Sequence, residues 1–68
     1  MSQRMEMYEK YDKLLKEHNV STYKVCAEKK IDNSRISDWK RDISTPKGDI
    51  IAKICDYFDV PITYFYGD

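Results

Sequence analysis

Residues 21–40 read STYKVCAEKKIDNSRISDWK, and this stretch predicts two short helices joined by a tight turn. Ser21 and Asp32 carry short oxygen-bearing side chains of the kind that cap helix N-termini, so each is expected to precede a helix. The pair Lys29-Lys30 marks the end of the first of these helices, and the second extends to about Lys40. The turn between them is therefore only a few residues long.

The apolar residues of this stretch are spaced so that both helices bury one face. Ile36 and Trp39 lie three positions apart, which places them on the same side of the second helix. Val25 and Cys26 are expected to face inward from the first helix, and Ile31 is expected to be a buried anchor between the two. Two helices that cross at a steep angle need a small residue where their axes approach, and Cys26 supplies one.

A longer helix is expected before this stretch, over residues 3–18. Its apolar residues recur at helical spacing and are Tyr8, Tyr11, Leu14 and Leu15. Asn19 can end this helix in a left-handed backbone conformation, which Asn tolerates better than most residues.

Two further helices are expected after the stretch. Thr45-Pro46 is a capping residue followed by proline at a first helical position, and it predicts the start of a fourth helix. The inward residues of that helix are Ile51, Ile54, Cys55 and Phe58. Val60-Pro61 ends it, and a short fifth element covers about Ile62 to Tyr66. We therefore expect an all-α fold in which residues 1–68 form a single five-helix domain.

The order of these anchors resembles the repressor family typified by Cro and lambda repressor, the Xre-type helix-turn-helix. The matching anchors are Ser21 as a cap, Val25-Cys26 as a hydrophobic and small pair, Lys29-Lys30 as a turn, Ile31-Asp32 as a hydrophobic residue with a cap, and Ile36. The stretch from Trp39 to Pro46 and the ending ICDYFDV at residues 54–60 also resemble the family. The resemblance implies a five-helix lambda-repressor-like domain with its helix-turn-helix core at residues 21–40. It also implies a sequence-specific, repressor-like transcriptional regulator and not an enzyme.

Three positions depart from the family pattern. Lys30 stands where the turn usually has glycine, and a left-handed conformation there would cost about 1–2 kcal/mol. Asp42 replaces the loop glycine after the third helix, and Asp tolerates that conformation better. Pro61 replaces the usual Ser or Thr before the fifth helix, so a start one residue later is expected there. These departures predict modest stability.

The resemblance implies that the third helix enters the major groove of DNA and contacts base edges. The base-contacting residues are then Asn33, Ser34, Ser37 and Asp38. Asn bonds adenine bidentately, Ser bonds either base as donor or acceptor, and Arg bonds guanine or phosphate. The residues expected to contact phosphates are Thr22, Lys24, Arg35, Lys40, Arg41 and Lys47. The expected partner is double-stranded DNA, read as a palindromic operator by a homodimer that forms through the C-terminal segment.

The distribution of charge favours DNA binding more than the total charge does. The formal net charge is +0, whereas DNA-binding domains tend to be basic. Residues 21–47 hold seven Lys or Arg against four Asp or Glu, a net charge of +3, and residues 48–68 hold one against four, a net charge of −3. The positive charge is therefore expected on the segment that contains the helix-turn-helix.

The two cysteines and the one histidine do not indicate a metal or catalytic site. Cys26 and Cys55 are expected to be small, buried and reduced, because the start MSQRME has no apolar signal segment and indicates a cytoplasmic protein. The family resemblance implies a bacterial or phage-encoded protein. No close ligand spacing involves His18, so no metal or other cofactor is expected. A catalytic pair of His18 with a thiol is not expected either. No apolar run is long enough to cross a membrane, and nothing indicates a small-molecule substrate.

One alternative stays open at this point. A protein-interaction module could keep the helix-turn-helix fold without binding DNA, as an antirepressor-like partner would. The zero net charge is compatible with it. So are Tyr57, Tyr64 and Tyr66, which are difficult to place together in so small a core and would equally suit a partner surface.

Overall fold

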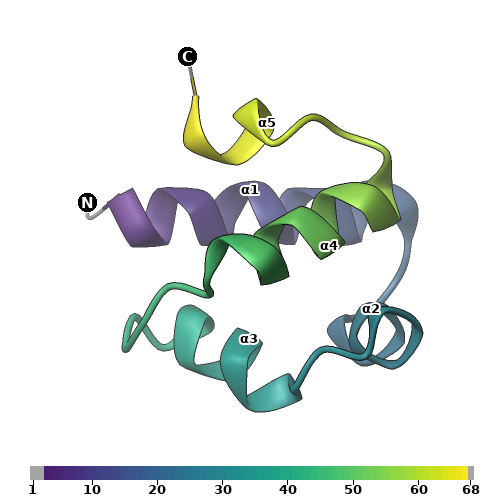
Figure 1. Cartoon of the computed structure of the whole chain (residues 1–68), viewed down its shortest axis with the longest axis horizontal. Helices are drawn as coiled ribbons and strands as arrows, with labels where there is room; N and C mark the ends of the chain where they lie inside the picture. The colour runs from purple at the N-terminus through teal and green to yellow at the C-terminus, as the bar shows by residue number, and fades with distance from the viewer. Residues whose placement is uncertain (1–2, 68) are drawn as a thin grey trace.

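The computed structural model describes residues 3–67, and this part of the chain is helical without any strand (Figure 1). The helices are α1 (Gln3–His18), α2 (Thr22–Lys29), α3 (Asn33–Lys40), α4 (Gly48–Phe58) and α5 (Thr63–Tyr66). Figure 1 shows α1 running through the middle of the molecule, with α2 and α3 on one side of it and α5 on the other. The expected all-α, five-helix fold is confirmed.

Side-chain caps begin both helices of the helix-turn-helix, as the sequence predicts. The Ser21 hydroxyl accepts a hydrogen bond from the backbone N–H of Lys24 at 3.3 Å, and the Asp32 carboxylate accepts one from the N–H of Ser34 at 3.0 Å. Each bond satisfies a donor that the first turn of a helix leaves free, which typically stabilises a helix by about 1 kcal/mol.

Non-glycine residues with a left-handed backbone conformation follow the first four helices of the described chain. Asn19, Lys30, Asp42 and Asp59 have φ angles of 54°, 56°, 58° and 57°. The sequence predicts the left-handed conformations of the first three, whereas no sequence pattern indicates that of Asp59. Lys30 has neither the short polar side chain of Asn or Asp nor the freedom of Gly, so its backbone is strained.

The core is built around Trp39, which is 0% exposed. Its ring stacks on Tyr11 of α1 with centroids 5.3 Å apart, and it lies 6.1 Å from the ring of Phe65 in α5. The remaining buried hydrophobic side chains are Met7, Leu14, Val25, Cys26, Ile31, Ile36, Ile51, Ile54, Cys55 and Phe58. Trp39 thus joins α3 to both α1 and α5.

The expected start of the fourth helix at Thr45-Pro46 is wrong. The helix begins at Gly48, and its N-cap is Lys47, which makes no side-chain capping bond. Pro46 is instead buried in the segment before the helix. The proline φ angle suits a first helical position and an extended segment equally well, so the local pattern could not distinguish them. The fifth helix begins at Thr63, one residue after Ile62, which is the later start that Pro61 predicts.

The buried face of α1 is also shifted relative to the sequence prediction. Met7, Tyr11 and Leu14 are buried, whereas Tyr8 and Leu15 are only half-buried and pack against the edge of the core. Tyr8 remains in contact with the core through its ring, which lies 5.5 Å from that of Trp39 in an edge-on arrangement. One edge of Tyr8 is therefore open to solvent.

Candidate nucleic-acid interface

The outer face of α3 carries the side chains that the sequence predicts as base contacts. Asn33, Ser34 and Ser37 are exposed, whereas Asp38 is half-buried. The inner face of the same helix holds Ile36, which is 2% exposed. Burial of that face holds α3 in place and leaves the polar face free.

A shallow hollow brings together predicted base and phosphate contacts from two helices. It is lined by Tyr8 of α1, Thr22 of α2, and Asn33, Ile36, Ser37 and Lys40 of α3, and we call it the α2–α3 hollow. Two predicted base contacts, Asn33 and Ser37, therefore lie beside two predicted phosphate contacts, Thr22 and Lys40. This is the arrangement that a helix in the major groove requires, with base-reading groups flanked by groups that bind the backbone.

The hydroxyl of Thr22 in α2 is hydrogen-bonded to a side chain of α1. Its Oγ1 atom lies 2.8 Å from the hydroxyl oxygen of Tyr11, and Tyr11 itself is 0% exposed. Burial is the main reason why the pKa of Tyr11 rises to about 12. Tyr11 is therefore a neutral hydroxyl at physiological pH that fixes the orientation of Thr22.

Arg35 and Lys47 meet on the opposite side of α3. Both line a second hollow, together with the hydroxyl residues Ser44 and Thr45 and the carboxylate of Asp49. Lys47 from the segment before α4 thus lies beside Arg35 of α3, and the two form a second group of cations next to this helix.

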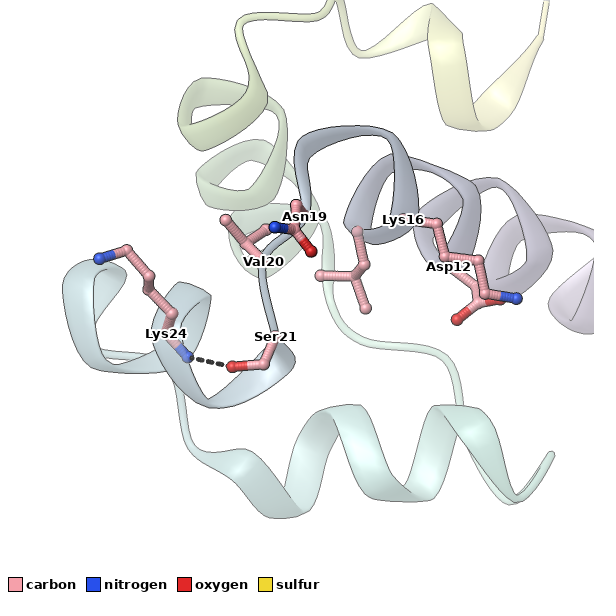
Figure 2. Close-up of a pocket in the computed structure, with 7 residues that line it drawn as sticks. Asp12, Lys16, Asn19, Val20, Ser21 and Lys24 are labelled. Atoms are coloured by element: carbon pink, nitrogen blue, oxygen red, sulfur yellow. Dashed lines mark hydrogen bonds and ion pairs between the residues drawn. The ribbon is translucent and has the colours of Figure 1, made fainter.

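Lys24 lies apart from the other predicted contacts. It lines a third hollow with Asp12, Lys16 and Ser21 between α1 and α2, and Figure 2 shows its side chain leading away from Asp12 and Lys16. Lys16 forms an ion pair of 2.9 Å with Asp12. Among the described residues that line this hollow, Lys24 is therefore the cation without an ion pair. It lies beside the N-terminus of α2.

Two polar contacts join α2 to α4 and neutralise part of the surface. Lys29 forms an ion pair with Asp56, and the Tyr57 hydroxyl bonds the Glu28 carboxylate. Burial first, and this carboxylate second, raise the pKa of Tyr57. Lys29 is therefore occupied by a structural contact. The predicted phosphate-contacting cations form no ion pair within the described chain; they are Lys24, Arg35, Lys40, Arg41 and Lys47.

Ser34 is engaged in capping α3. Its backbone N–H and its hydroxyl both bond the Asp32 carboxylate, and these bonds, with the charge of Arg35, hold the pKa of Asp32 below its ordinary value. A base contact by Ser34 would have to share its hydroxyl with this cap. Asn33 and Ser37 have no such competing bond among the described residues.

The cysteines are buried free thiols on separate helices. Burial raises the pKa of both Cys26 and Cys55, and the charge of Asp32 adds to the effect at Cys26. The ring of His18 packs against Phe58 with centroids 5.0 Å apart. Within residues 3–67, no group of three or more His, Cys, Asp or Glu side chains is placed to hold a metal ion.

The sequence did not predict that Tyr8 lines the α2–α3 hollow. A helical stripe indicates which residues of a helix are buried, but not which residues of other helices they contact. The sequence also gave no signal for Tyr23 and Ile43, which are 74% and 54% exposed.

None of the helices in the described part of the chain is both long and apolar enough to cross a membrane.

The fold and the polar surface of α3 define a helix-turn-helix DNA-binding domain. Residues 10–63 match the family described as the Cro/C1-type HTH DNA-binding domain. The chain belongs to this family, whose members are DNA-binding regulators and typically not enzymes. Searches of curated proteins and of solved structures give no significant match.

Proposed function

We propose that this protein is a repressor-like transcriptional regulator that binds a palindromic operator as a homodimer, in the cytoplasm of a bacterium or of a phage-infected cell. One observation supports it best. The exposed Asn33 and Ser37 line the α2–α3 hollow together with Thr22 and Lys40, so side chains suited to bases lie beside side chains suited to phosphates.

In this proposal α3 reads the operator through its outer face. The base-contacting residues are Asn33, Ser34, Ser37 and Asp38. Asn33 and Ser37 have the principal roles, because Ser34 is tied to the Asp32 cap and Asp38 is half-buried. The phosphates are bound by Thr22, Lys24, Arg35, Lys40, Arg41 and Lys47, with the backbone amides at the start of α2.

The proposed dimer contact is the exposed apolar surface of the C-terminal segment. Ile62 and Tyr66 are 42% and 47% exposed, whereas Tyr64 is half-buried and donates a hydrogen bond to the Lys10 carbonyl at 3.3 Å. We therefore assign the contact to Ile62 and Tyr66. Two recognition helices about 34–36 Å apart would read two half-sites separated by one turn of DNA. Sedimentation with a selected operator should find two protomers per site.

Salt dependence of DNA binding tests the proposed function. A dimer that binds phosphates through these five cations of each protomer should lose affinity with a slope of log K against log salt of about −9. Selection from a random duplex library should then yield a palindromic consensus. Absence of binding to any duplex at low salt would contradict the proposal and favour a protein-interaction module, which the exposed Tyr23 and Ile43 would suit.

A further inference from the structure

Tyr8 differs from the other buried tyrosines of this chain in its hydroxyl group. Four tyrosines are buried or half-buried, namely Tyr8, Tyr11, Tyr57 and Tyr64. The hydroxyls of the last three bond Thr22, Glu28 and the Lys10 carbonyl, respectively. The Tyr8 hydroxyl has no hydrogen-bond partner among the described residues. Partly buried tyrosines usually have one, so this group is expected to find a partner outside the chain.

The ring of Tyr8 is held firmly enough to present that hydroxyl in one place. Its ring centroid lies 5.5 Å from that of Trp39 and 5.8 Å from that of Tyr11, and both of these rings are fully buried. The same side chain lines the α2–α3 hollow next to Thr22 and Lys40. Tyr8 thus reaches the proposed DNA surface from α1, a helix outside the helix-turn-helix.

We propose that Tyr8 is a DNA-contacting residue whose hydroxyl donates a hydrogen bond to a backbone phosphate oxygen, at the edge of the surface where Thr22 and Lys40 bind the backbone. This inference rests on the proposed DNA-binding function and adds a contact from the first helix. A phosphate is the partner because its oxygens are pure acceptors, and because Tyr8 lies on a different helix from the base-reading residues. Burial raises the pKa of Tyr8, so the hydroxyl keeps its proton at neutral pH.

A neutral donor has a signature that a cation does not share. Each Lys or Arg that neutralises a phosphate adds about one unit to the salt slope, through counterion release. A tyrosine hydroxyl releases no counterion. Removal of the Tyr8 hydroxyl should therefore lower affinity by the same factor at every salt concentration, whereas removal of Lys40 should also flatten the slope.

The test compares Tyr8→Phe with wild type, using a short random-sequence duplex over a range of salt concentrations. Phenylalanine keeps the ring contacts with Trp39 and Tyr11, so the fold is preserved. We expect a loss of about 3- to 10-fold in affinity, parallel to the wild-type salt line. Tyr57→Phe is the matched control, because it removes a hydroxyl that bonds Glu28 between α2 and α4, and its affinity should equal that of wild type. Lys40→Ala should give a line flatter by about one unit for each bound protomer.

The outcomes separate this inference from the proposed function. Binding by wild type and equal binding by Tyr8→Phe would overturn the role of Tyr8 and leave the DNA-binding function intact. An equal loss in Tyr57→Phe would also overturn it, since the effect would then not depend on the hollow. Absence of binding by wild type would overturn the proposed function and this inference with it.

Discussion

The hydroxyl oxygen of Tyr11 lies 2.8 Å from Oγ1 of Thr22, and this bond joins the buried middle of α1 to the first residue of α2. A side chain at the proposed phosphate-binding edge is thereby positioned by one at the centre of the core. The position of the α2 N-terminus is consequently coupled to the integrity of the core.

The burial of the Tyr11 hydroxyl predicts a dependence of stability on alkaline pH. The pKa of Tyr11 is raised from its ordinary value of 10.0 to about 12, chiefly by burial, so the folded state holds its proton more tightly than the unfolded state. Its contribution to stability is complete below pH 10 and is lost as the pH rises through about 12. Tyr11→Phe should flatten the dependence of the unfolding free energy on pH in this window, measured by urea denaturation. A curve parallel to wild type would show that Tyr11 does not titrate as described.

Lys30→Gly should stabilise the protein. Lys30 has a φ of 56°, which costs a non-glycine residue about 1–2 kcal/mol, and the greater flexibility of unfolded glycine offsets about 0.5–1 kcal/mol of the gain. The net effect should be about 0.5–1 kcal/mol, or a rise in Tm of about 2–8 °C in thermal denaturation. Lys53→Gly makes the same chemical change at an exposed position inside α4 and should destabilise by about 1 kcal/mol. Both variants shifting in the same direction would argue against strain at Lys30.

Asn33→Ala and Arg41→Ala should separate base reading from phosphate binding. Loss of a bidentate base contact at Asn33 should cost about 1–3 kcal/mol on a selected operator and little on random DNA. Loss of Arg41 should weaken both equally and flatten the salt slope by about one unit. Titrations of both duplexes at several salt concentrations provide the measurement. Full operator preference in a folded Asn33→Ala protein would mean that α3 does not read the sequence as proposed.

Ile36→Ala should act on the fold and not on recognition. Ile36 is 2% exposed on the inner face of α3, and its truncation leaves a cavity that costs about 2–5 kcal/mol. In a domain of this size much of the protein should then be unfolded, which circular dichroism would detect. Retention of full helicity and Tm would show that the packing at this site can relax.

The two thiols should react only when the protein opens. Cys26 and Cys55 are 2% and 5% exposed, and burial raises the pKa of both, so few thiolates exist at neutral pH. A thiol reagent should modify both within seconds in denaturant and far more slowly in the native state, at a rate that follows local unfolding. Fast modification of either residue in native buffer would contradict the burial described here.

The amino-acid sequence was sufficient for those features that depend on nearby residues. The caps at Ser21 and Asp32, the left-handed positions at Asn19 and Lys30, and the burial of Trp39 follow from local hydrogen bonding and helical periodicity, which act over a few residues.

Only the tertiary structure decided which face of a helix packs against its neighbours. A helical stripe on α1 is compatible with several faces, and the crossings of α3 and α5 determine that Met7 is buried and Tyr8 is left at the edge. For the same reason Pro46 is buried in the segment before α4 instead of starting that helix. The α2–α3 hollow joins three helices, so its grouping of Tyr8 with Thr22 and Asn33 arises from packing over long sequence distances, to which no local pattern responds.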